Sequence, residues 1–440
     1  MKKVLVLGAG LVSRPMAHYL LDIPDIQVTV ASRTVSKAEA LLNGHPHGRA
    51  IALLVEDSTA LDRLIAKSNL VVSLLPYGHH PKVARYCIKR RKPMVTASYV
   101  SKEMKILDKD ARKAGVIILN EVGLDPGIDH MSAMKTINWV RKHKGVVTSF
   151  MSYCGGLPAP DANDNPFGYK FSWSPKGVLM AGHNEASYLR EGRKVFVPSE
   201  KLFGHRWSLT IEGAGEFEAY PNRDSLPYIE LYGLEKIKTM FRGTLRYPGW
   251  CETLEAISHL GLLDDVPNDD IAGLTAAAWL REHVPGDGDL RADTAAELGL
   301  VEDTPVLDRL EWLGLFNDEP IGLARGSDVD VLVKLMLNRM TYRPHERDMI
   351  ILRHEFGAEY PGGLKKKITS TLVAYGEPDG DSAMARTVGL PTAIAVRKIL
   401  EGRIKLTGVH IPVIPEIYKP ILTELERLGI RFREKSAKVA

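Results

Sequence analysis

The chain has 440 residues, which are too many for a single ordinary hydrophobic core, so two or three domains are predicted. With 45% hydrophobic and 25% charged residues, the composition is that of a globular protein. The 58 basic and 54 acidic residues give a net charge of +4, and no basic run is interleaved with aromatic residues. Nothing in this balance requires nucleic acid, and we expect no nucleic-acid partner.

Three widely spaced cysteines, Cys87, Cys154 and Cys251, form neither a disulfide framework nor a CxxC metal pair. We therefore expect a reducing, cytoplasmic environment and no metal. Gly8 and Gly10 interrupt the first apolar run too early for a signal peptide. No apolar run reaches the ~20 residues that a membrane span requires, so no membrane association is expected.

Residues 1–35 predict a strand, a glycine turn, a helix and a second strand. Residues 3–7 and 27–31 are apolar runs typical of buried parallel strands. Between them, Gly8 permits a sharp turn, and Gly10 has no Cβ to obstruct a pyrophosphate at the start of the helix. Ser13 stands where the dinucleotide-binding fingerprint has its third glycine, so the alternative is a tight turn in another α/β protein.

The end of the second strand indicates which dinucleotide binds. It carries Ser32, Arg33 and Thr34, with no carboxylate for the ribose 2′-hydroxyl of NAD. Arg33 and the two hydroxyls can hold a 2′-phosphate, which favours NADP over NAD. The alternative is that Arg33 is a solvated surface residue.

Strands and helices alternate up to residue 119, which predicts an α/β fold with a doubly wound parallel sheet. Further strands are expected at 51–55, 70–75, 94–97 and 116–119, and helices from 36, at 57–68, at 81–90 and at 101–115.

Ligands of such sheets bind beyond the carboxyl ends of the strands. The loops there are residues 75–77, 97–99 and 121–127. In the last loop, Asp125 and Pro126 also have the pattern of a helix cap and first turn. Asp125 therefore either faces a ligand or only caps a helix.

The pattern changes from residue 145 onward. Residues 146–153 alternate like an antiparallel strand, and 154–160 predict a rigid turn rich in glycine and proline. Residues 165–177 mix polar and aromatic side chains, as a ligand surface does. Two loop-like clusters, 221–225 and 242–247, carry arginines that either clamp a carboxylate or form surface ion pairs.

The remainder is mostly helical, and its late helices are free to return to the first sheet. A small helical domain is expected at 249–327, with helices at 254–263, 271–284 and 306–315. After it we expect a helix at 329–337, paired strands at 349–359 and 367–375, and helices at 382–400 and 417–428.

Several long motifs, in the same order along nearly the whole chain, resemble the L-glutamate-forming saccharopine dehydrogenases, also called saccharopine reductases. They are GAGLVSRP from residue 8, VTASY from 95, GLDPGIDH from 123, SYCGGLPAP from 152, YKFSWS from 169, YPNRDS from 220, RGTLRY from 242 and SAMA from 382.

The resemblance implies three domains and a homodimer. They are a Rossmann domain of residues 1–125 and 381–440, a mixed α/β domain of 126–245 and 335–380 with the main dimer contact, and a helical insertion of 246–334. It also implies interconversion of saccharopine with L-glutamate and 2-aminoadipate 6-semialdehyde in lysine metabolism with a nicotinamide cofactor, for which residues 32–34 favour NADP(H).

The resemblance further implies a set of residues that line the cofactor beside the turn glycines Gly8 and Gly10. These are Ala9, Leu11, Val12, Ser32, Arg33, Thr34, Val55, Leu75, Ala97, Ser98, Leu124, Asp125, Pro126 and Ser174. Family members often have Asp where this chain has Leu54, so only the backbone and Val55 are expected near the adenine. Residues 32–34 resemble the NADP-using fungal members, whereas much of the rest is closer to the NAD-using domain of the animal bifunctional enzyme.

Saccharopine, with three carboxylates and a secondary amine, would be held by a second set of residues. By resemblance these are Ser98, Tyr99, Asp125, Arg223, Thr244, Leu245 and Arg246. The two arginines are candidates for bidentate carboxylate binding.

Oxidation of the amine gives an imine, which water hydrolyses to the aldehyde and the amine. These steps need groups near the nitrogen that transfer protons, and the candidate catalytic residues in the matching loops are Tyr99, Asp125 and Cys154. The alternative for Cys154 is a small buried residue in a turn. His130 is expected to orient the helix start near Asp125.

Two other interpretations stay open. A carboxynorspermidine-type reductase joins a diamine to an aldehyde and has fewer substrate carboxylates to hold. A non-catalytic NADPH-sensing protein would keep only the Rossmann site, although the polar loop content of residues 154–174 argues against it.

Overall fold

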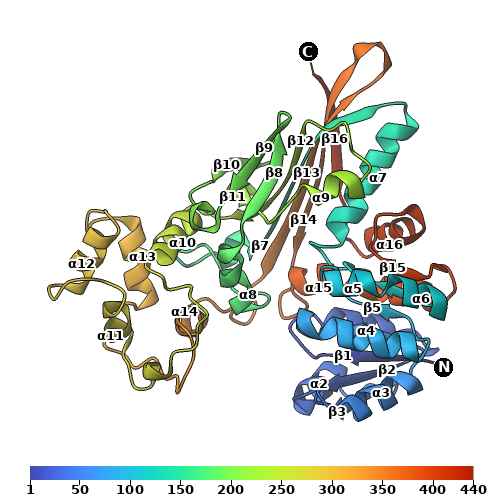
Figure 1. Ribbon diagram of the computed structural model, residues 1–440, viewed down its shortest axis with the longest axis horizontal. Coiled ribbons are helices and arrows are strands. Elements are labelled where there is room, and N and C mark those ends of the chain that lie inside the picture. Colours follow the sequence, from blue (N-terminus) through green and yellow to red (C-terminus); the bar gives the residue numbers. More distant parts are fainter. Residues whose placement is uncertain (440) are drawn as a thin grey trace. The chain divides into compact units, whose positions relative to one another are not determined.

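A computed structural model describes residues 1–439 and divides into two compact units (Figure 1). Unit 1 contains Met1–Val146, Glu359–Leu364 and Gly380–Lys435. Unit 2 contains Val147–Ala358, Lys365–Asp379 and the residues from Ser436 onward. Each unit has its own sheet, so each is described by itself.

Unit 1 is built on a seven-stranded parallel sheet in the order β3-β2-β1-β4-β5-β6-β15. The first six strands follow the Rossmann order, which confirms the predicted fold class. The strands are β1 (Lys2–Leu7), β2 (Ile26–Ser32), β3 (Gly48–Ala52), β4 (Leu70–Ser73), β5 (Met94–Val95), β6 (Ile117–Leu119) and β15 (Gly408–His410).

Helices accompany this sheet as the alternating pattern predicts. They are α1 (Arg14–Leu21), α2 (Val35–Leu42), α3 (Ser58–Lys67), α4 (His80–Lys89), α5 (Lys102–Ile106), α6 (Asp108–Ala114), α7 (Ile128–Lys142), α15 (Ala383–Leu400) and α16 (Pro415–Arg427). The strands between them are apolar: residues 4–7 of β1 are at most 2% exposed. Burial of both faces explains why β1 reads as a continuous apolar run.

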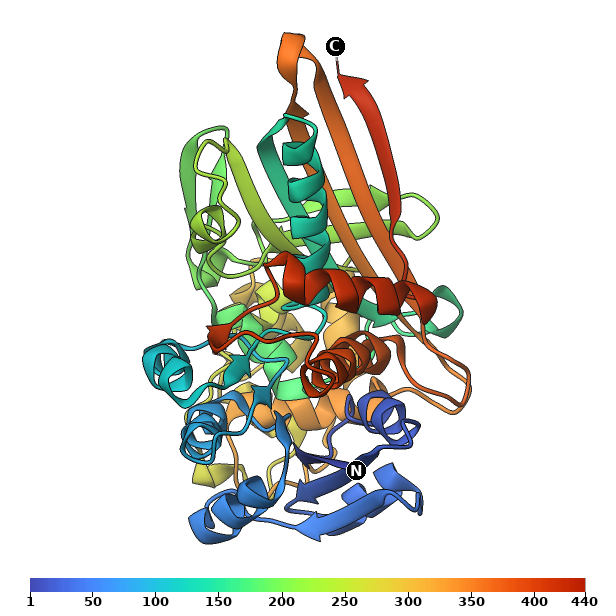
Figure 2. The same cartoon turned by 90° about the vertical axis from the view of Figure 1, so that its right-hand side faces the viewer.

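The two late helices do return to unit 1, as expected. Figure 2 shows α16 lying across α7, and the Asn138 side chain of α7 donates a hydrogen bond of 2.9 Å to the Tyr418 hydroxyl of α16. Helix α15 lies against α1, where Gly389 allows close packing: a Cβ there would be 3.0 Å from the Val12 carbonyl oxygen and 3.1 Å from the Met16 nitrogen. The glycine turn therefore rests on a chain segment far away in sequence.

Unit 2 holds a nine-stranded mixed sheet. Its main path is β10-β11-β12-β7-β13-β14-β16, with β8 on β12 and β9 on β8; β12 runs parallel to β7 and antiparallel to β11. The strands are β7 (Val146–Pro158), β8 (Ala186–Arg190), β9 (Arg193–Val197), β10 (Trp207–Ile211), β11 (Gly215–Pro221), β12 (Thr239–Arg246), β13 (Asp348–Glu359), β14 (Lys365–Tyr375) and β16 (Arg433–Val439).

Unit 2 also contains helices. They are α8 (Pro175–Met180), α9 (Pro227–Leu231), α10 (Trp250–His259), α11 (Ala276–Arg281), α12 (Leu290–Glu297), α13 (Pro305–Leu313) and α14 (Asp328–Arg339). Of these, α10 to α13 lie within residues 246–334, where a helical insertion is predicted. One hydrophobic cluster joins these helices to the sheet, running from Tyr153 and Phe217 to Trp279 and Leu310. The three-domain division stays a prediction.

Two predicted loops are strands instead. Residues 154–160 do not form a turn, because β7 continues to Pro158, and residues 242–246 lie in β12. The two segments pair in parallel, with Thr244 opposite Cys154. A Cβ on Gly155 would be 2.9 Å from the Leu245 Cβ, so this glycine serves close strand packing rather than a turn.

Several boundaries also differ from the sequence prediction. The third strand is Gly48–Ala52 rather than 51–55, because its register places Gly48 opposite Val28 and Ala52 opposite Ser32. The predicted helix at 101–115 is two helices that meet at Leu107. Strands β8 to β11, β15 and β16 were not predicted, since short strands with one exposed face carry a weak pattern.

We expect Gly389→Ala to destabilise the protein by about 1–3 kcal/mol, because the added methyl group meets backbone atoms of residues 12 and 16. Alanine in a helix is normally more stabilising than glycine by roughly 0.5–1 kcal/mol, so a decrease in the free energy of unfolding would indicate the steric contact. Chemical denaturation measures it. Gly78→Ala, where a Cβ meets open space, is the control, and an unchanged or higher stability of Gly389→Ala would contradict the packing described.

Candidate functional site

The glycine turn after β1 has the backbone that a dinucleotide site requires. Gly8 has φ of +108°, and a Cβ there would be 2.9 Å from the Leu74 carbonyl oxygen. At Gly10 a Cβ would meet open space, so the backbone is approachable from that side. Ser13 replaces the third glycine without disrupting the turn, because its Oγ accepts a hydrogen bond of 3.1 Å from the Gly10 amide. The side chain of Leu11 is 68% exposed beside it.

Arg33 follows β2 with its side chain exposed. Among residues 1–439 it has no hydrogen-bond or ion-pair partner, whereas the Ser32 hydroxyl accepts a hydrogen bond of 3.3 Å from the Thr34 amide. A guanidinium unused by the protein at this strand end fits a 2′-phosphate.

The predicted adenine contact lies after β3. Leu54 is 56% exposed, and Val55 is half-buried. The Lys82 ammonium donates hydrogen bonds to the Val55 and Glu56 carbonyl oxygens, at 2.8 and 3.2 Å. The Val55 carbonyl is therefore already bound, and its side chain and amide are the groups left for a ligand.

Tyr99 and Asp125 are brought together by the loops after β5 and β6. The Tyr99 hydroxyl donates a hydrogen bond of 3.0 Å to Asp125 Oδ1, and both residues are half-buried. The prediction that Asp125 caps a helix is wrong, because α7 begins at Ile128 with Gly127 as its N-cap residue. The Gly127 amide donates instead to Asp129 Oδ1, at 2.5 Å.

A buried carboxylate, Glu121, holds these two loops in place. Its Oε1 accepts a hydrogen bond of 2.8 Å from the Val100 amide, and its Oε2 lies 2.7 Å from His130 Nε2. Its own amide donates to the Ser98 carbonyl, and its φ of +60° is unusual for a residue with a side chain. Strain of this kind persists where the surrounding structure requires it, here beside the predicted site.

His80 connects the loops after β4 and β5. Its Nδ1 lies 2.9 Å from Ser73 Oγ and its Nε2 lies 2.8 Å from Ser98 Oγ. The residue is 2% exposed, and burial, with a smaller effect from the nearby His79, lowers the pKa of His80 to about 4. At neutral pH its ring is uncharged, with one nitrogen as donor and the other as acceptor. His80 thus sets the orientation of the Ser98 hydroxyl.

In unit 2 the predicted residues gather on one face of the sheet. Thr244 on β12 lies opposite Cys154 on β7 and opposite Tyr220 on β11, so the three side chains form a row across adjacent strands. Arg246 is two residues further along β12 on the same face. Leu245 points to the other face and is fully buried in the hydrophobic cluster, so only its backbone faces this row.

The two candidate arginines differ sharply. Arg246 is 5% exposed, and its guanidinium carbon lies 5.0 Å from the centre of the Tyr169 ring and 5.4 Å from that of Trp250. Arg223 is exposed, in the loop after β11, with a left-handed φ of +57° and a carbonyl that accepts from the Ser187 amide.

The remaining cofactor candidates also fall at element ends. Ser174 is the N-cap residue of α8, where its Oγ accepts a hydrogen bond of 3.2 Å from the Gly177 amide. Leu124 and Pro126 are buried, whereas Ala97 and Leu75 are half-buried. For the buried pair, the backbone is the part that a cofactor can reach.

Sequence reasoning did not assign roles to His80, Glu121, Tyr169 and Trp250. Glu121 comes directly after a parallel strand, a position that could have marked it. His80 opens a helix seven residues after Ser73, and nothing in that spacing shows that its ring reaches both serines. Tyr169 and Trp250 lie 81 residues apart along the chain, so only the fold brings them to Arg246.

The Rossmann strand order, the glycine turn and the uncommitted Arg33 together define a dinucleotide-binding protein of the doubly wound α/β class. Residues 4–119 match the family model described as the saccharopine dehydrogenase NADP binding domain. Residues 123–430 match the model of the saccharopine dehydrogenase C-terminal domain. The first description agrees with the NADP site predicted from residues 32–34.

Relatives that match 99% of this chain give the same assignment. The chain is 42% identical to saccharopine dehydrogenase [NADP(+), L-glutamate-forming] of Saccharomyces cerevisiae, with 99% of each chain covered. It is 41% identical to the mitochondrial alpha-aminoadipic semialdehyde synthase of Bos taurus, covering 99% of this chain and 48% of the bovine protein. The solved apo structure of the Saccharomyces cerevisiae saccharopine dehydrogenase (L-Glu forming) superimposes with a TM-score of 0.90, at 41% identity over 99% of this chain and 100% of that one. The chain belongs to the saccharopine dehydrogenase family, which confirms the resemblance.

Within residues 1–439, no helix is long and apolar enough to cross a membrane. The same part of the chain contains no group of three or more His, Cys, Asp or Glu side chains that could hold a metal ion.

We expect Arg33→Ala to weaken NADPH binding about tenfold to a hundredfold, the value of a charge-assisted hydrogen bond, and to leave NADH binding unchanged. Fluorescence titration of the reduced cofactors measures both. Arg63→Ala, which removes another exposed arginine of unit 1, is the control. Equal loss for NADPH and NADH would show that Arg33 does not contact the 2′-phosphate.

The buried His80 predicts a loss of stability in acid. Its pKa is about 4 in the folded protein and about 6.5 when unfolded, so the unfolded state binds more protons between these values. The free energy of unfolding should therefore decrease by up to about 3 kcal/mol as the pH falls from 6.5 to 4.

Denaturation curves of wild-type protein and of His80→Gln across this range test the effect. The variant should lose this part of the pH dependence, while His143→Gln, at an exposed histidine, should keep it. An identical slope for His80→Gln and wild type would contradict the burial of a neutral ring.

Proposed function

We propose that this protein is an NADP(H)-dependent, L-glutamate-forming saccharopine dehydrogenase of lysine metabolism. It would interconvert saccharopine with L-glutamate and 2-aminoadipate 6-semialdehyde. The relatives of that name support this, since they match the whole chain. The observation that carries the proposal is Arg246, a buried arginine with no ion-pair partner within residues 1–439, because saccharopine has three carboxylates to offer.

The cofactor would be held by unit 1. The Gly8–Gly10 turn leaves its backbone accessible to a pyrophosphate, and Arg33 offers an unused guanidinium for the 2′-phosphate. Bound NADP supplies the hydride acceptor. Ser98 lies in a strand-end loop where its hydroxyl is held by His80, so it would enter the site already oriented.

The substrate would be held by the charged and polar groups that the family resemblance assigns to it. Arg223 and Arg246 are assigned to carboxylates, and Thr244 lies on the same sheet face as Arg246. Tyr99 and Asp125 already share a hydrogen bond, so a proton can pass between a phenol and a carboxylate near the substrate nitrogen. Cys154 is half-buried and lies opposite Thr244 on the same face of the sheet.

The direct test is turnover of saccharopine with NADP and with NAD, followed by the absorbance of the reduced cofactor. We expect a higher kcat/KM with NADP. Arg223→Ala and Arg246→Lys should each raise KM for saccharopine at least about tenfold, because a bidentate carboxylate contact is lost. Arg193→Ala, at an exposed arginine of unit 2, should leave KM unchanged.

A protein that reduces no cofactor with saccharopine would contradict the proposal. If both arginine variants keep the wild-type KM, a carboxynorspermidine-type reductase becomes the better assignment, since its substrates need fewer cationic partners. Tight NADPH binding without turnover of any amine–aldehyde pair would instead favour a cofactor-sensing protein.

Family resemblance also supports a homodimer with the dimer contact in unit 2, and the three cysteines without a disulfide support a reducing, cytoplasmic environment. Light scattering coupled to size-exclusion chromatography measures the oligomeric state, and an observed mass of one chain of 48.7 kDa would contradict the dimer.

A further inference from the structure

Three hydrogen-bond donors without acceptors are buried together in unit 2. They are Arg246 Nε, Trp250 Nε1 and the Tyr169 hydroxyl, and none of these atoms has a hydrogen-bond partner within residues 1–439. Tyr169 is 0% and Trp250 1% exposed, so solvent does not replace the missing partners. A buried donor without an acceptor is costly, and it is rare in folded proteins.

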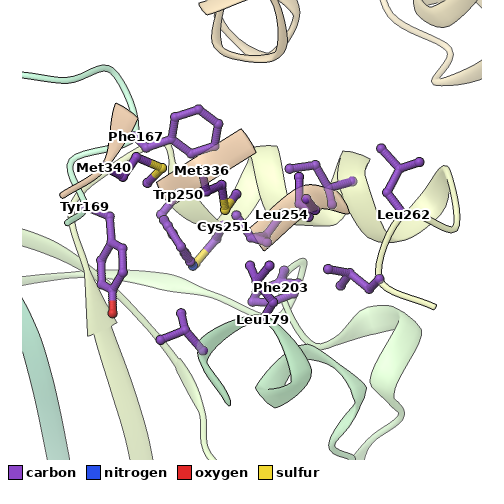
Figure 3. Close-up of a cluster of buried hydrophobic side chains, with 14 of the residues drawn as sticks. Phe167, Tyr169, Leu179, Phe203, Trp250, Cys251, Leu254, Leu262, Met336 and Met340 are labelled. Atoms are coloured by element: carbon purple, nitrogen blue, oxygen red, sulfur yellow. The ribbon is translucent and has the colours of Figure 1, made fainter. Parts of the chain in front are cut away.

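The three groups belong to one cluster. The Tyr169 and Trp250 ring centres are 4.6 Å apart, and the Arg246 guanidinium lies over both rings. Figure 3 shows Tyr169 and Trp250 beside Phe167 and Met340, with the Tyr169 hydroxyl pointing away from these apolar side chains. The indole of Trp173 also approaches the Tyr169 oxygen, and an indole is a donor only. The cluster therefore presents donors and lacks acceptors.

Within residues 1–439, no carboxylate forms an ion pair with the Arg246 guanidinium. Burial raises the pKa of Tyr169 and raises that of Tyr220 to about 12, so both hydroxyls keep their protons at neutral pH. Glu218 is opposite Arg246 on β11, but its carboxylate accepts hydrogen bonds from the Gly249 and Cys251 amides, at 3.2 and 3.0 Å. That acid is used at the start of α10 and forms no ion pair with Arg246.

Within residues 1–439, Arg246 donates a single hydrogen bond, from Nη1 to the carbonyl oxygen of Leu245, 2.9 Å away. Most of its donor capacity is therefore uncommitted, although the residue is 95% buried. A cation in this position needs an anion with several acceptor lone pairs, and a carboxylate supplies them.

We infer that the Tyr169 hydroxyl and the Trp250 indole N–H join Arg246 in binding one carboxylate of the substrate. This inference rests on the proposed function and extends it by two residues. The guanidinium lies over both aromatic rings, and their polar atoms complete a three-donor site. Tyr169 and Trp250 thereby select a substrate with a planar, negatively charged group at this position, against an amide or an amine.

Isosteric variants test the inference without removing the rings. Tyr169→Phe deletes only the hydroxyl, and Trp250→Phe deletes the indole N–H while leaving an aromatic ring against the guanidinium. We expect each to raise KM for saccharopine about tenfold to a hundredfold, as for hydrogen bonds to a charged group, with KM for NADP unchanged. Calorimetric titration with saccharopine should show the same loss in Kd.

Tyr342→Phe is the matched control, because its hydroxyl is also buried without a partner, but its ring faces the Lys170 ammonium at 6.0 Å. It should bind saccharopine as wild type does. Thermal unfolding of all variants distinguishes an effect on binding from an effect on stability. If Trp250→Phe does not fold, Tyr169→Phe, which is the smaller change, tests the inference by itself.

The outcomes are separable. If wild-type protein binds saccharopine and both variants keep the wild-type KM and Kd, the roles of Tyr169 and Trp250 are overturned, but the proposed function is not. That result would indicate that ordered water satisfies the buried donors. Wild-type protein that does not bind saccharopine would overturn the proposed function and this assignment with it.

Discussion

A guanidinium buried without a carboxylate partner is the constraint on which unit 2 depends. Placing Arg246 in the interior costs several kcal/mol unless other groups compensate. Cation–π interactions with the rings of Tyr169 and Trp250 offset part of this cost, on the order of 1–2 kcal/mol for a desolvated cation over an aromatic face. The remaining deficit is what the carboxylate proposed above would offset.

In unit 1, buried hydrogen bonds hold the loops at the strand ends, which have little secondary structure of their own. His80 joins the loop after β4 to Ser98, and Glu121 joins the loop after β5 to His130. Thr392 of α15 donates a hydrogen bond of 2.6 Å to the Val122 carbonyl, so the end of the chain braces the same region. These buried groups are uncharged or paired, and they position Ser98, Tyr99 and Asp125 before any ligand arrives.

Each unit carries part of the predicted set of site residues. Unit 1 offers accessible amides, the free Arg33 guanidinium and the Tyr99–Asp125 pair. Unit 2 offers a sheet face with Cys154, Thr244 and Arg246 in adjacent positions. Each set is built on strands or strand ends, where backbone pairing holds side chains more firmly than a free loop does.

The sequence by itself determined the Rossmann half almost completely, because buried parallel strands and glycine turns are local patterns, and it also indicated NADP through Ser32, Arg33 and Thr34. Its motifs identified the family and named Arg246. It misjudged residues 154–160 and 242–247, where glycines serve close strand packing and polar side chains lie on one face of a sheet. Only the tertiary structure decided that Asp125 pairs with Tyr99 rather than capping a helix, that His80 holds Ser98, and that Tyr169 and Trp250 enclose Arg246. These contacts join residues far apart in the chain, and no local pattern of spacing or polarity encodes which distant partner a side chain meets.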